Sequence, residues 1–437
     1  MVSAKALKKR NERLERELAR IRTSPSLRLG AHITNAIRKP WLALFLPLTL
    51  PLLMLLIGFE LLGWRAQPPS SSPLLGEGKK PDSNTVLMFP TNGVGFGHFT
   101  RMLAVARRMK KQDPMVNIVF FTTMPTLHLL IPEGIPAHYI SGQKKYRDMD
   151  AARWNALVEE ELTLAFEVHN PGMFIFDGAF PYRGMLRAIN GQQMQKTWLR
   201  RGTFRKGSRI PVDSIEHFDL IIHPEDSVPL PTSEIDHGVE VLTCPPIVML
   251  DTDEMLTREA ARRRLMLPLD ARVIYVQLGA GAINYIDSEV RLTVEALTRY
   301  EDVHVVLGES MIGKRLDISM ERVHIVRDYP NSMYFPAFDA SIQAGGYNSF
   351  HETRNFGLPT LFYPNMETGM DDQLARCMVA DEEGWGIILK ERNEITIETA
   401  IDDLLDCIKD IVSPTVESGA WQLARSLAER MVLEERE

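Results

Sequence analysis

Residues 343–373 read QAGGYNSFHETRNFGLPTLFYPNMETGMDDQ, and no other segment of the chain carries as many structural signals. An apolar strand over 340–344 is predicted to lead through a Gly-Gly turn into a helix that opens at Asn348-Ser349. A Gly-Leu-Pro break at 357–359 separates this helix from a second apolar strand at 360–363. Strand, turn, helix and strand in this order predict a βαβ unit of a parallel sheet.

The Gly-Gly turn predicts a binding site for an anion such as a diphosphate. Backbone N–H groups and the positive end of the helix dipole converge where a glycine turn leads into a helix. Gly345 and Gly346 have no side chain to keep a phosphate away from the backbone. Asn348 and Ser349 lie at the start of the helix, where the Ser349 hydroxyl adds a further donor.

Three polar side chains nearby suit the other parts of a nucleotide sugar. Glu352 lies one turn along the helix and is placed to accept hydrogen bonds from ribose hydroxyls. Asp372 and Gln373 end a loop after the next strand, and the carboxyl ends of parallel strands are where ligand groups collect. We therefore expect the turn to bind the diphosphate, Glu352 the ribose, and Asp372 with Gln373 the hexose.

The same segment resembles the donor signature of GT-B glycosyltransferases, both the UDP-glycosyltransferases and the bacterial transferase that adds N-acetylglucosamine to lipid I. The plant signature HCGWNS, Glu, Gly-x-Pro, Asp/Glu-Gln is matched in order by AGGYNS, Glu352, GLP and DDQ. Ala344 departs from it, because the plant enzymes have a phosphate-binding His there, and the spacing from Glu352 to Gln373 is slightly long. The alternative is an ordinary helix start in an α/β domain.

A second glycine-rich loop, NGVGFGH at 92–98, lies between an expected strand and an expected helix. Gly93, Gly95 and Gly97 predict a tight turn that brings the backbone close to a ligand. A dinucleotide site needs an acidic residue at the end of the second strand, where this chain has Thr122-Thr123, so a dehydrogenase is disfavoured. The loop and the LAVARRM helix after it resemble the acceptor-side loop of the lipid I transferase family, which also ends in His.

This second resemblance implies that His98 is the general base. A sugar hydroxyl needs a proton acceptor within about 3 Å when it attacks an anomeric carbon, and His suits neutral pH. Asp177 ends the strand FIFD and matches in place the Asp that orients the His in plant enzymes. The alternatives are a His98 that caps a helix or contacts phosphate, and an Asp177 that caps the next turn.

The protein is expected to use no metal and no cofactor; the nucleotide sugar is a co-substrate. Asp251 and Asp253 form a D-x-D sequence, but they lie in a hinge rather than after the apolar strand that this metal motif requires. The negative charge of the leaving group is expected to be stabilised by the turn at Gly346 and by Gly279 and Gly281, in a loop after the second domain's first strand. Preorganised hydrogen-bond donors of this kind can replace a metal.

Two successive regions alternate strands with helices, which predicts an α/β protein with parallel sheets. The resemblance implies that these regions are the two Rossmann-like domains of the GT-B class, whose parallel sheets face a cleft. The expected divisions are a basic cytoplasmic tail at 1–40, a membrane segment at 41–64, a linker at 65–83, an acceptor-side domain at 84–243, a donor-binding domain at 244–415 and a C-terminal helix at 416–437. The resemblance implies that this last helix packs back on the first domain.

The N-terminal segment predicts contact with a membrane. Residues 1–40 contain eleven Lys and Arg and three Glu, a net charge of +8. The whole chain has a net charge of −7, so the remaining residues carry −15. Residues 4–22 are expected to form a basic helix, either a membrane-surface helix or a short coiled coil for self-association, and 24–39 a basic connector. The run 41–59 has no charge and is long enough for one crossing.

Two topologies are compatible with this segment. The positive-inside rule places the tail in the cytoplasm, and nucleotide sugars are there too, so a re-entrant segment bent at Pro47 and Pro51 keeps the body on the cytoplasmic face of a bacterial inner membrane. The alternative is a single crossing, as in a type II Golgi enzyme. The lack of N-x-S/T sequons and three widely spaced cysteines, which are expected to be buried thiols, favour the reducing compartment.

The motifs and the N-terminal segment predict a membrane-associated glycosyltransferase that moves a sugar from a nucleotide donor, of UDP type, to a lipid-linked or polysaccharide acceptor of the cell envelope. The resemblance implies that the transfer proceeds with inversion. An acidic body argues against nucleic-acid binding. The basic run at 196–209 is either solvated surface or an attraction for anionic headgroups. Two alternatives stay open: a nucleotide-sugar 2-epimerase, and a catalytically silent GT-B-like membrane scaffold.

Overall fold

The computed structural model describes residues 24–62, 81–91, 95–200, 214–229, 238–279, 287–311, 315, 317–366, 368, 371–407 and 418–436. They form two compact units, divided between Lys80 and Pro81. The expected helix at 4–22 and most of the basic run lie outside the described residues.

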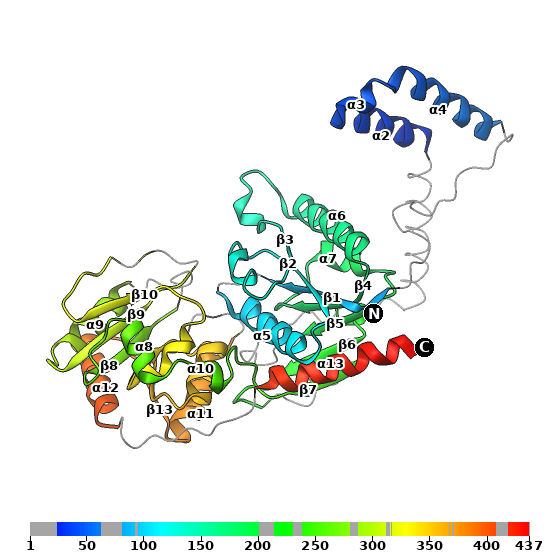
Figure 1. Cartoon of the computed structure of the whole chain (residues 1–437). Coiled ribbons are helices and arrows are strands. Elements are labelled where there is room, and N and C mark those ends of the chain that lie inside the picture. Colours follow the sequence, from blue (N-terminus) through cyan, green and yellow to red (C-terminus); the bar gives the residue numbers. More distant parts are fainter. Residues whose placement is uncertain are drawn as a thin grey trace, which may run out of the picture. The chain divides into compact units, whose positions relative to one another are not determined.

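The smaller unit is a helical hairpin made of α2 (Pro25–Arg38), α3 (Pro40–Ala43) and α4 (Leu46–Leu61) (Figure 1). The prediction of a connector at 24–39 is wrong, because Ser24 caps α2 and Pro25 suits its first turn. The apolar run breaks between α3 and α4, ahead of Pro47, whose ring would clash with the carbonyl four residues before it. Among the described residues, no helix combines the length and the apolar character needed to cross a membrane.

Two polar contacts join α2 to α4. Arg28 forms an ion pair with Glu60, whose side chain is buried, and His32 Nε2 lies 2.9 Å from Thr49 Oγ1. Most large apolar side chains of the hairpin are nevertheless exposed within this unit: Leu27, Ile33, Ile37, Trp41, Leu42, Leu44, Phe45, Leu48, Leu52, Met54, Leu55 and Leu62. An exposed apolar surface of this kind usually marks a site of contact with another protein or with a membrane.

The first domain of the larger unit is built on a sheet of seven parallel strands in the order β3-β2-β1-β4-β5-β6-β7. The strands are β1 (Asp82–Pro90), β2 (Asn117–Thr122), β3 (Ala137–Tyr139), β4 (Pro171–Asp177), β5 (Gln195–Leu199), β6 (Leu220–Pro224) and β7 (Glu240–Cys244). The helices between them are α5 (Gly97–Gln112), α6 (Ala151–His169) and α7 (Arg183–Ile189). Successive residues of β1 point to opposite faces, so Val86 and Met88 enter one core and Leu87 and Phe89 the other.

The second domain has six parallel strands in the order β10-β9-β8-β11-β12-β13. They are β8 (Arg272–Gln277), β9 (Val303–Gly308), β10 (Val323–Val326), β11 (Ala340–Gln343), β12 (Thr360–Phe362) and β13 (Gly386–Ile388). Its helices are α8 (Arg258–Arg264), α9 (Asp287–Thr298), α10 (Tyr347–Asn355), α11 (Gln373–Glu382) and α12 (Glu394–Cys407). The predicted unit of strand, Gly-Gly turn, helix and strand is confirmed as β11, α10 and β12.

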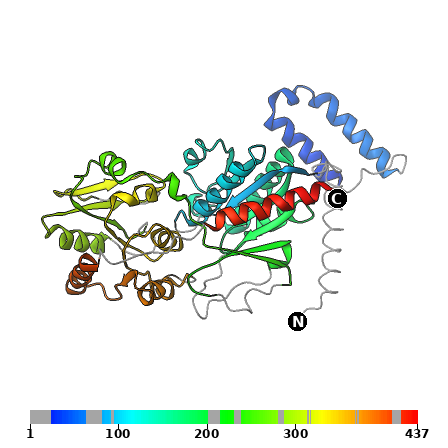
Figure 2. The ribbon, with the colours of Figure 1, turned by 60° about the horizontal axis from the view of Figure 1, so that its bottom comes forward.

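The last helix, α13 (Gly419–Arg436), belongs to the first domain, as the resemblance implied (Figure 2). Ala420, Leu423 and Leu427 are fully buried in the core that α5 covers. A Cβ on Gly419 would lie 1.8 Å from the carbonyl oxygen of Pro245, so only glycine allows the chain to pass there. Cys244 and Cys377 are buried, as predicted, while the Cys407 side chain is not described.

Two neighbouring strands of the second sheet bring His304 and His324 together. Nδ1 of His304 lies 3.1 Å from Nε2 of His324 on β10, and the rings are stacked. Burial lowers the pKa of both imidazoles below the ordinary value; Arg322 and Arg262 lower that of His304 further, and His304 lowers that of His324. Protonation of this pair therefore opposes folding.

We predict that the second domain loses stability as pH falls below about 6.5. The unfolded chain binds protons at the ordinary histidine pKa and the folded chain only at the lowered one, so the loss begins at the former and ends at the latter. His324→Gln removes one proton site and should flatten the pH dependence of Tm between pH 7.5 and 5.5. His128→Gln, at an exposed position, is the control; an equal effect of both variants would contradict the prediction.

Candidate active site

The predicted anion site lies where β11 leads into α10. Gly346 is the residue before the helix, at φ −65°, and α10 has neither a side-chain cap nor an acidic residue in its first turn. The first-turn N–H groups of a helix have no acceptor within the helix, so this end favours a negatively charged ligand. Asn348 and Ser349 lie in this first turn, as the sequence predicted.

The two glycines of the turn serve different purposes. A Cβ on Gly346 would meet no atom within 4 Å, so the space beside it is open. A Cβ on Gly345 would lie 2.3 Å from Sγ of Cys377 on α11. Gly345 is therefore required by the packing of the turn on α11, a reason that the sequence alone did not reveal, and its contact with phosphate stays a prediction.

Arg376 on α11 holds this turn in place. Its Nη1 donates to the carbonyl oxygen of Gly345 at 2.7 Å, and its Nη2 donates to Asp371 at 2.7 Å. Nε and Nη2 also donate to the carboxylate of Asp226, which follows β6 in the first domain. Burial acts to raise the pKa of Asp226, but Arg376 and His351 outweigh it and hold that pKa well below the usual range.

Tyr347, the first residue of α10, has two guanidinium groups close to its ring. Arg101 of the first domain lies 5.3 Å from the centre of its ring, and Arg376 lies 5.8 Å from it. Its hydroxyl donates to the carbonyl oxygen of Glu225 at 3.0 Å and accepts from the N–H of Ile247 at 3.3 Å. Cation–π contacts of this kind are strongest where water is excluded, and Tyr347 is buried.

The structure brings His98 and Asp177 together. His98 is the second residue of α5, Asp177 is the last residue of β4, and Nδ1 of the imidazole lies 2.6 Å from Oδ1 of the carboxylate. An ionised carboxylate only accepts, so Nδ1 carries the proton and, in the neutral ring, Nε2 carries the lone pair. This is the tautomer that a base acting through Nε2 requires.

Arg101 completes this group and was not identified from the sequence. Its Nη2 lies 2.7 Å from Oδ1 of Asp177 and 2.9 Å from Nδ1 of His98, and its Nε lies 3.2 Å from Oδ2 of Asp177. Burial acts to raise the pKa of Asp177, but Arg101 and then His98 outweigh it, so that pKa is lowered. The three-residue spacing from His98, which puts both side chains on one face of a helix, was the available signal.

The glycine loop that ends in His98 contacts the start of α10. Nδ2 of Asn348 donates to the carbonyl oxygen of Gly97 at 3.5 Å, across 251 positions of the sequence. Among the described residues, the buried Oδ1 atoms of Asn348 and Asn331 have no hydrogen-bond partner. A buried acceptor without a partner costs about 1–3 kcal/mol, which a ligand donor would recover.

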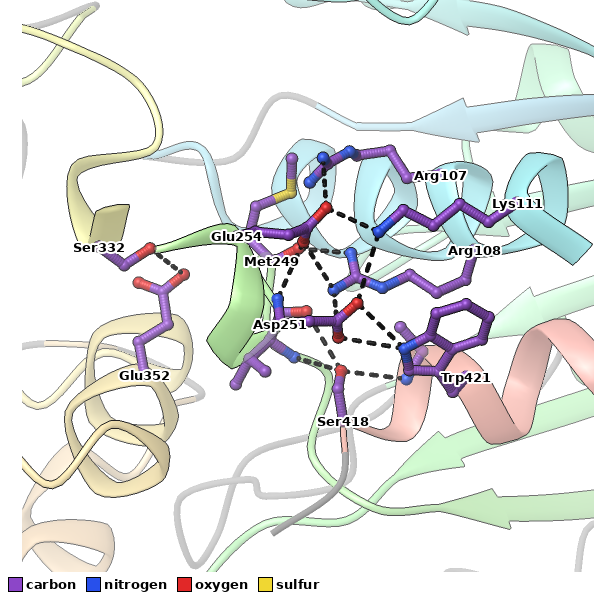
Figure 3. Close-up of polar contacts among 12 residues, drawn as sticks. Arg107, Arg108, Lys111, Met249, Asp251, Glu254, Ser332, Glu352, Ser418 and Trp421 are labelled. Atoms are coloured by element: carbon purple, nitrogen blue, oxygen red, sulfur yellow. Dashed lines mark hydrogen bonds and ion pairs between the residues drawn. The ribbon is translucent and has the colours of Figure 1, made fainter. Parts of the chain in front are cut away.

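Glu352 lies one turn along α10 and carries a perturbed carboxyl group. Ser332 donates to its Oε1 at 3.4 Å (Figure 3). Burial raises its pKa to about 7, against the lowering effect of hydrogen bonds from Ser332 and the backbone of Met249. A desolvated carboxyl of this kind gains strongly when a ligand supplies hydroxyl donors.

Asp251, the first residue of the D-x-D sequence, is bound to cations and to Trp421 (Figure 3). Arg108 Nη2 lies 2.7 Å from its Oδ1, and Trp421 Nε1 donates to both oxygens at 3.1 Å. Glu254 beside it pairs with Arg107 at 2.8 Å and Lys111 at 2.7 Å. Within the described residues, no cluster of three or more His, Cys, Asp or Glu is arranged to hold a metal.

The remaining predicted residues have local structural partners or lie outside the described residues. Asp372 caps α11 by accepting from the N–H of Ala375 at 3.0 Å, and Gln373 Oε1 accepts from the N–H of Asn365 at 2.9 Å. Gly279 has a φ of +102°, which requires glycine. Gly97 is the first residue of α5 and Gly95 lies two residues before it, while Gly93 and Gly281 are not described. Their contacts with a ligand stay predictions.

Comparison with solved structures shows the fold. The matches include a putative UDP-N-acetylglucosamine 2-epimerase from Listeria monocytogenes (TM-score 0.54, 14% identity, 80% of this chain and 94% of that chain) and the glycotransferase of kitacinnamycin (0.53, 14%, 80% and 98%). The calicheamicin glycosyltransferase also matches (0.52, 16%, 82% and 95%). No protein-family model and no curated protein matches. The chain has the GT-B fold, as the resemblance implied.

We predict that affinity for UDP rises with pH through about 7 and that Glu352 causes part of this rise. Ribose hydroxyls donate to the ionised carboxylate, so binding must release the proton that Glu352 holds below its pKa of about 7. Calorimetric titration at pH 6, 7 and 8 in buffers of different ionisation enthalpy measures both affinity and proton release. Glu352→Gln should bind UDP more weakly and show a smaller rise in affinity with pH; an unchanged profile would remove Glu352 from the site.

Proposed function

We propose that this protein is a glycosyltransferase that moves a sugar from a nucleotide donor of UDP type to a hydroxyl of a lipid-linked or polysaccharide acceptor. The reaction proceeds with inversion and without a metal. The proposal is carried by one observation: the loop of the His98–Asp177 pair contacts the start of the donor helix through Gly97 and Asn348. A base and an anion site in contact are what a sugar transfer to a hydroxyl requires.

The chemistry follows from the positions of these groups. Nε2 of His98 accepts the proton of the acceptor hydroxyl while its oxygen forms a bond to the anomeric carbon. The bond from that carbon to the diphosphate oxygen breaks, and its electron pair leaves with the nucleotide. The N–H groups at the start of α10 stabilise the developing negative charge, and Asp177 stabilises the imidazolium.

Two rival functions fit the same fold. A nucleotide-sugar 2-epimerase is supported by the epimerase among the structures of similar fold, and it needs no acceptor. A silent subunit is favoured by Ala344, which leaves the phosphate to backbone groups. The arrangement of His98, Asp177 and the buried unpaired oxygen of Asn348 favours the transferase over the silent subunit, because an unfilled site of this kind costs stability.

A panel of nucleotide sugars, incubated with and without a detergent-solubilised lipid acceptor, separates the three functions. Transfer to the acceptor supports the proposal, interconversion of sugars without acceptor supports the epimerase, and neither supports the silent subunit. His98→Ala should lower the single-turnover transfer rate by about 10²–10⁴-fold, with donor affinity nearly unchanged.

Asp177→Asn should lower the rate less than His98→Ala, because it removes an orienting group rather than the base. The double variant should be no worse than His98→Ala alone, since the two residues act as one unit. Additive losses would mean that the residues act separately, and a near-wild-type rate for His98→Ala would exclude it as the base.

We further propose that the helical hairpin attaches the enzyme to a membrane, with the catalytic body on the cytoplasmic face. The proposal is supported by the exposed apolar side chains of α3 and α4, the net charge of +8 in residues 1–40, and the return of α4 along α2. A lipid-linked acceptor in the same membrane would then be held at high local concentration.

Deletion of residues 1–66 should yield a protein that still binds UDP but has lost much of its activity on a lipid acceptor in vesicles. Its activity on a short, soluble acceptor should be retained, since the deletion removes no residue of the larger unit. A truncated protein as active as the full chain on vesicle-bound acceptor would contradict the tether. Cleavage of the body by protease added outside spheroplasts would contradict the cytoplasmic orientation.

A further inference from the structure

One buried ion pair joins the two domains and takes no part in the chemistry above. The side chain of Asp226, after β6, is 3% exposed, and that of Arg376, on α11, is 0% exposed. Nε of Arg376 lies 2.9 Å from Oδ1 and Nη2 lies 2.7 Å from Oδ2, so the contact is bidentate. We propose that Asp226 is a positioning residue for the nucleotide site: through Arg376, it makes the shape of the donor turn depend on contact between the domains.

The same guanidinium also contacts the turn before α10. Nη1 donates to the carbonyl oxygen of Gly345, the residue before the cap of α10. A guanidinium is planar and holds its N–H groups at fixed angles. If Asp226 withdraws, Arg376 cannot keep its geometry to both partners, and the peptide that orients the first N–H groups of α10 loses its fixed direction.

Energetics favour a functional reason for this pair over a purely structural one. Two charges removed from water cost several kcal/mol each, and a buried ion pair often stabilises a protein no more than apolar side chains would. The attraction that offsets this cost is complete only when Arg376 contacts all its partners, and those partners come from both domains: Asp226, Asp371 and Gly345. The free energy of this arrangement therefore differs more between the state with the domains in contact and the state with the domains apart than it would for apolar packing.

The coupling extends to the acid–base pair. Tyr347 follows the turn directly, and the guanidinium groups of Arg376 and Arg101 lie 5.8 Å and 5.3 Å from the centre of its ring. Arg101 in turn binds both oxygens of Asp177. A change in the position of Arg376 is thus passed to the group that orients His98. This inference rests on the proposed function in naming a nucleotide diphosphate as the ligand.

The test removes both charges at once, as Asp226→Asn with Arg376→Met, because removal of one would leave an unpaired buried charge and risk unfolding. Spin labels are placed on exposed cysteines introduced at Glu160 of α6 and Asp403 of α12, in a chain with Cys407→Ser. The distance distribution between the labels should broaden in the double variant. The dissociation constant for UDP, measured by calorimetry, should rise about tenfold, within the usual range of coupling between sites.

The matched control is Arg262→Met with Asp339→Asn. This ion pair is also buried on its arginine side, with Nη2 3.0 Å from Oδ2, but it lies within the second domain at the opposite end of β11. It should lower Tm without changing the distance distribution or the affinity. An unchanged distance distribution or an unchanged affinity for UDP in the Asp226/Arg376 variant overturns the inference. A wild-type protein that binds no nucleotide overturns the proposed function, and the inference that rests on it falls too.

Discussion

The guanidinium of Arg376 is the constraint on which the second half of the site depends. Its N–H groups are divided among two carboxylates and one backbone carbonyl, and each acceptor comes from a different segment of the chain. Cys377, the next residue, fills the space in which a side chain on Gly345 would lie. The turn before α10 is therefore held by two neighbouring residues of α11, and a turn with so few degrees of freedom would lose little entropy on binding a ligand.

The first half of the site balances charge differently. Asp177 is shared between Arg101 and His98, so its negative charge is largely compensated before the imidazole gains a proton. The guanidinium also lies close to Nδ1 of His98 and opposes the formation of an imidazolium there. The group thus fixes the orientation and tautomer of His98 more than it strengthens the base. In the proposed reaction, the rate would then depend mainly on how well the acceptor hydroxyl is positioned against Nε2 of His98.

The parts of this structure that the sequence predicted are those where local chemistry repeats in a recognisable order. The segment 340–363 was predicted because glycine and proline mark the ends of its strands and helix, and His98 with Asp177 because each ends a loop or strand that matches a known pattern. Asp226 was missed because its partner Arg376 lies 150 positions away and no local pattern links them. The helix α2 was missed because residues 24–39 were expected to be a basic connector before the membrane segment, although Ser24-Pro25 is a good helix start.

The position of α13 has a consequence for how the protein is made. The first domain ends at β7, yet its core is incomplete until Ala420, Leu423 and Leu427 arrive, after the whole second domain has left the ribosome. Until these residues are made, the apolar surface of α5 that they cover has no partner, and exposed surface of this kind makes incompletely folded chains prone to aggregation. The first core therefore depends on a helix that follows the whole second domain in the sequence.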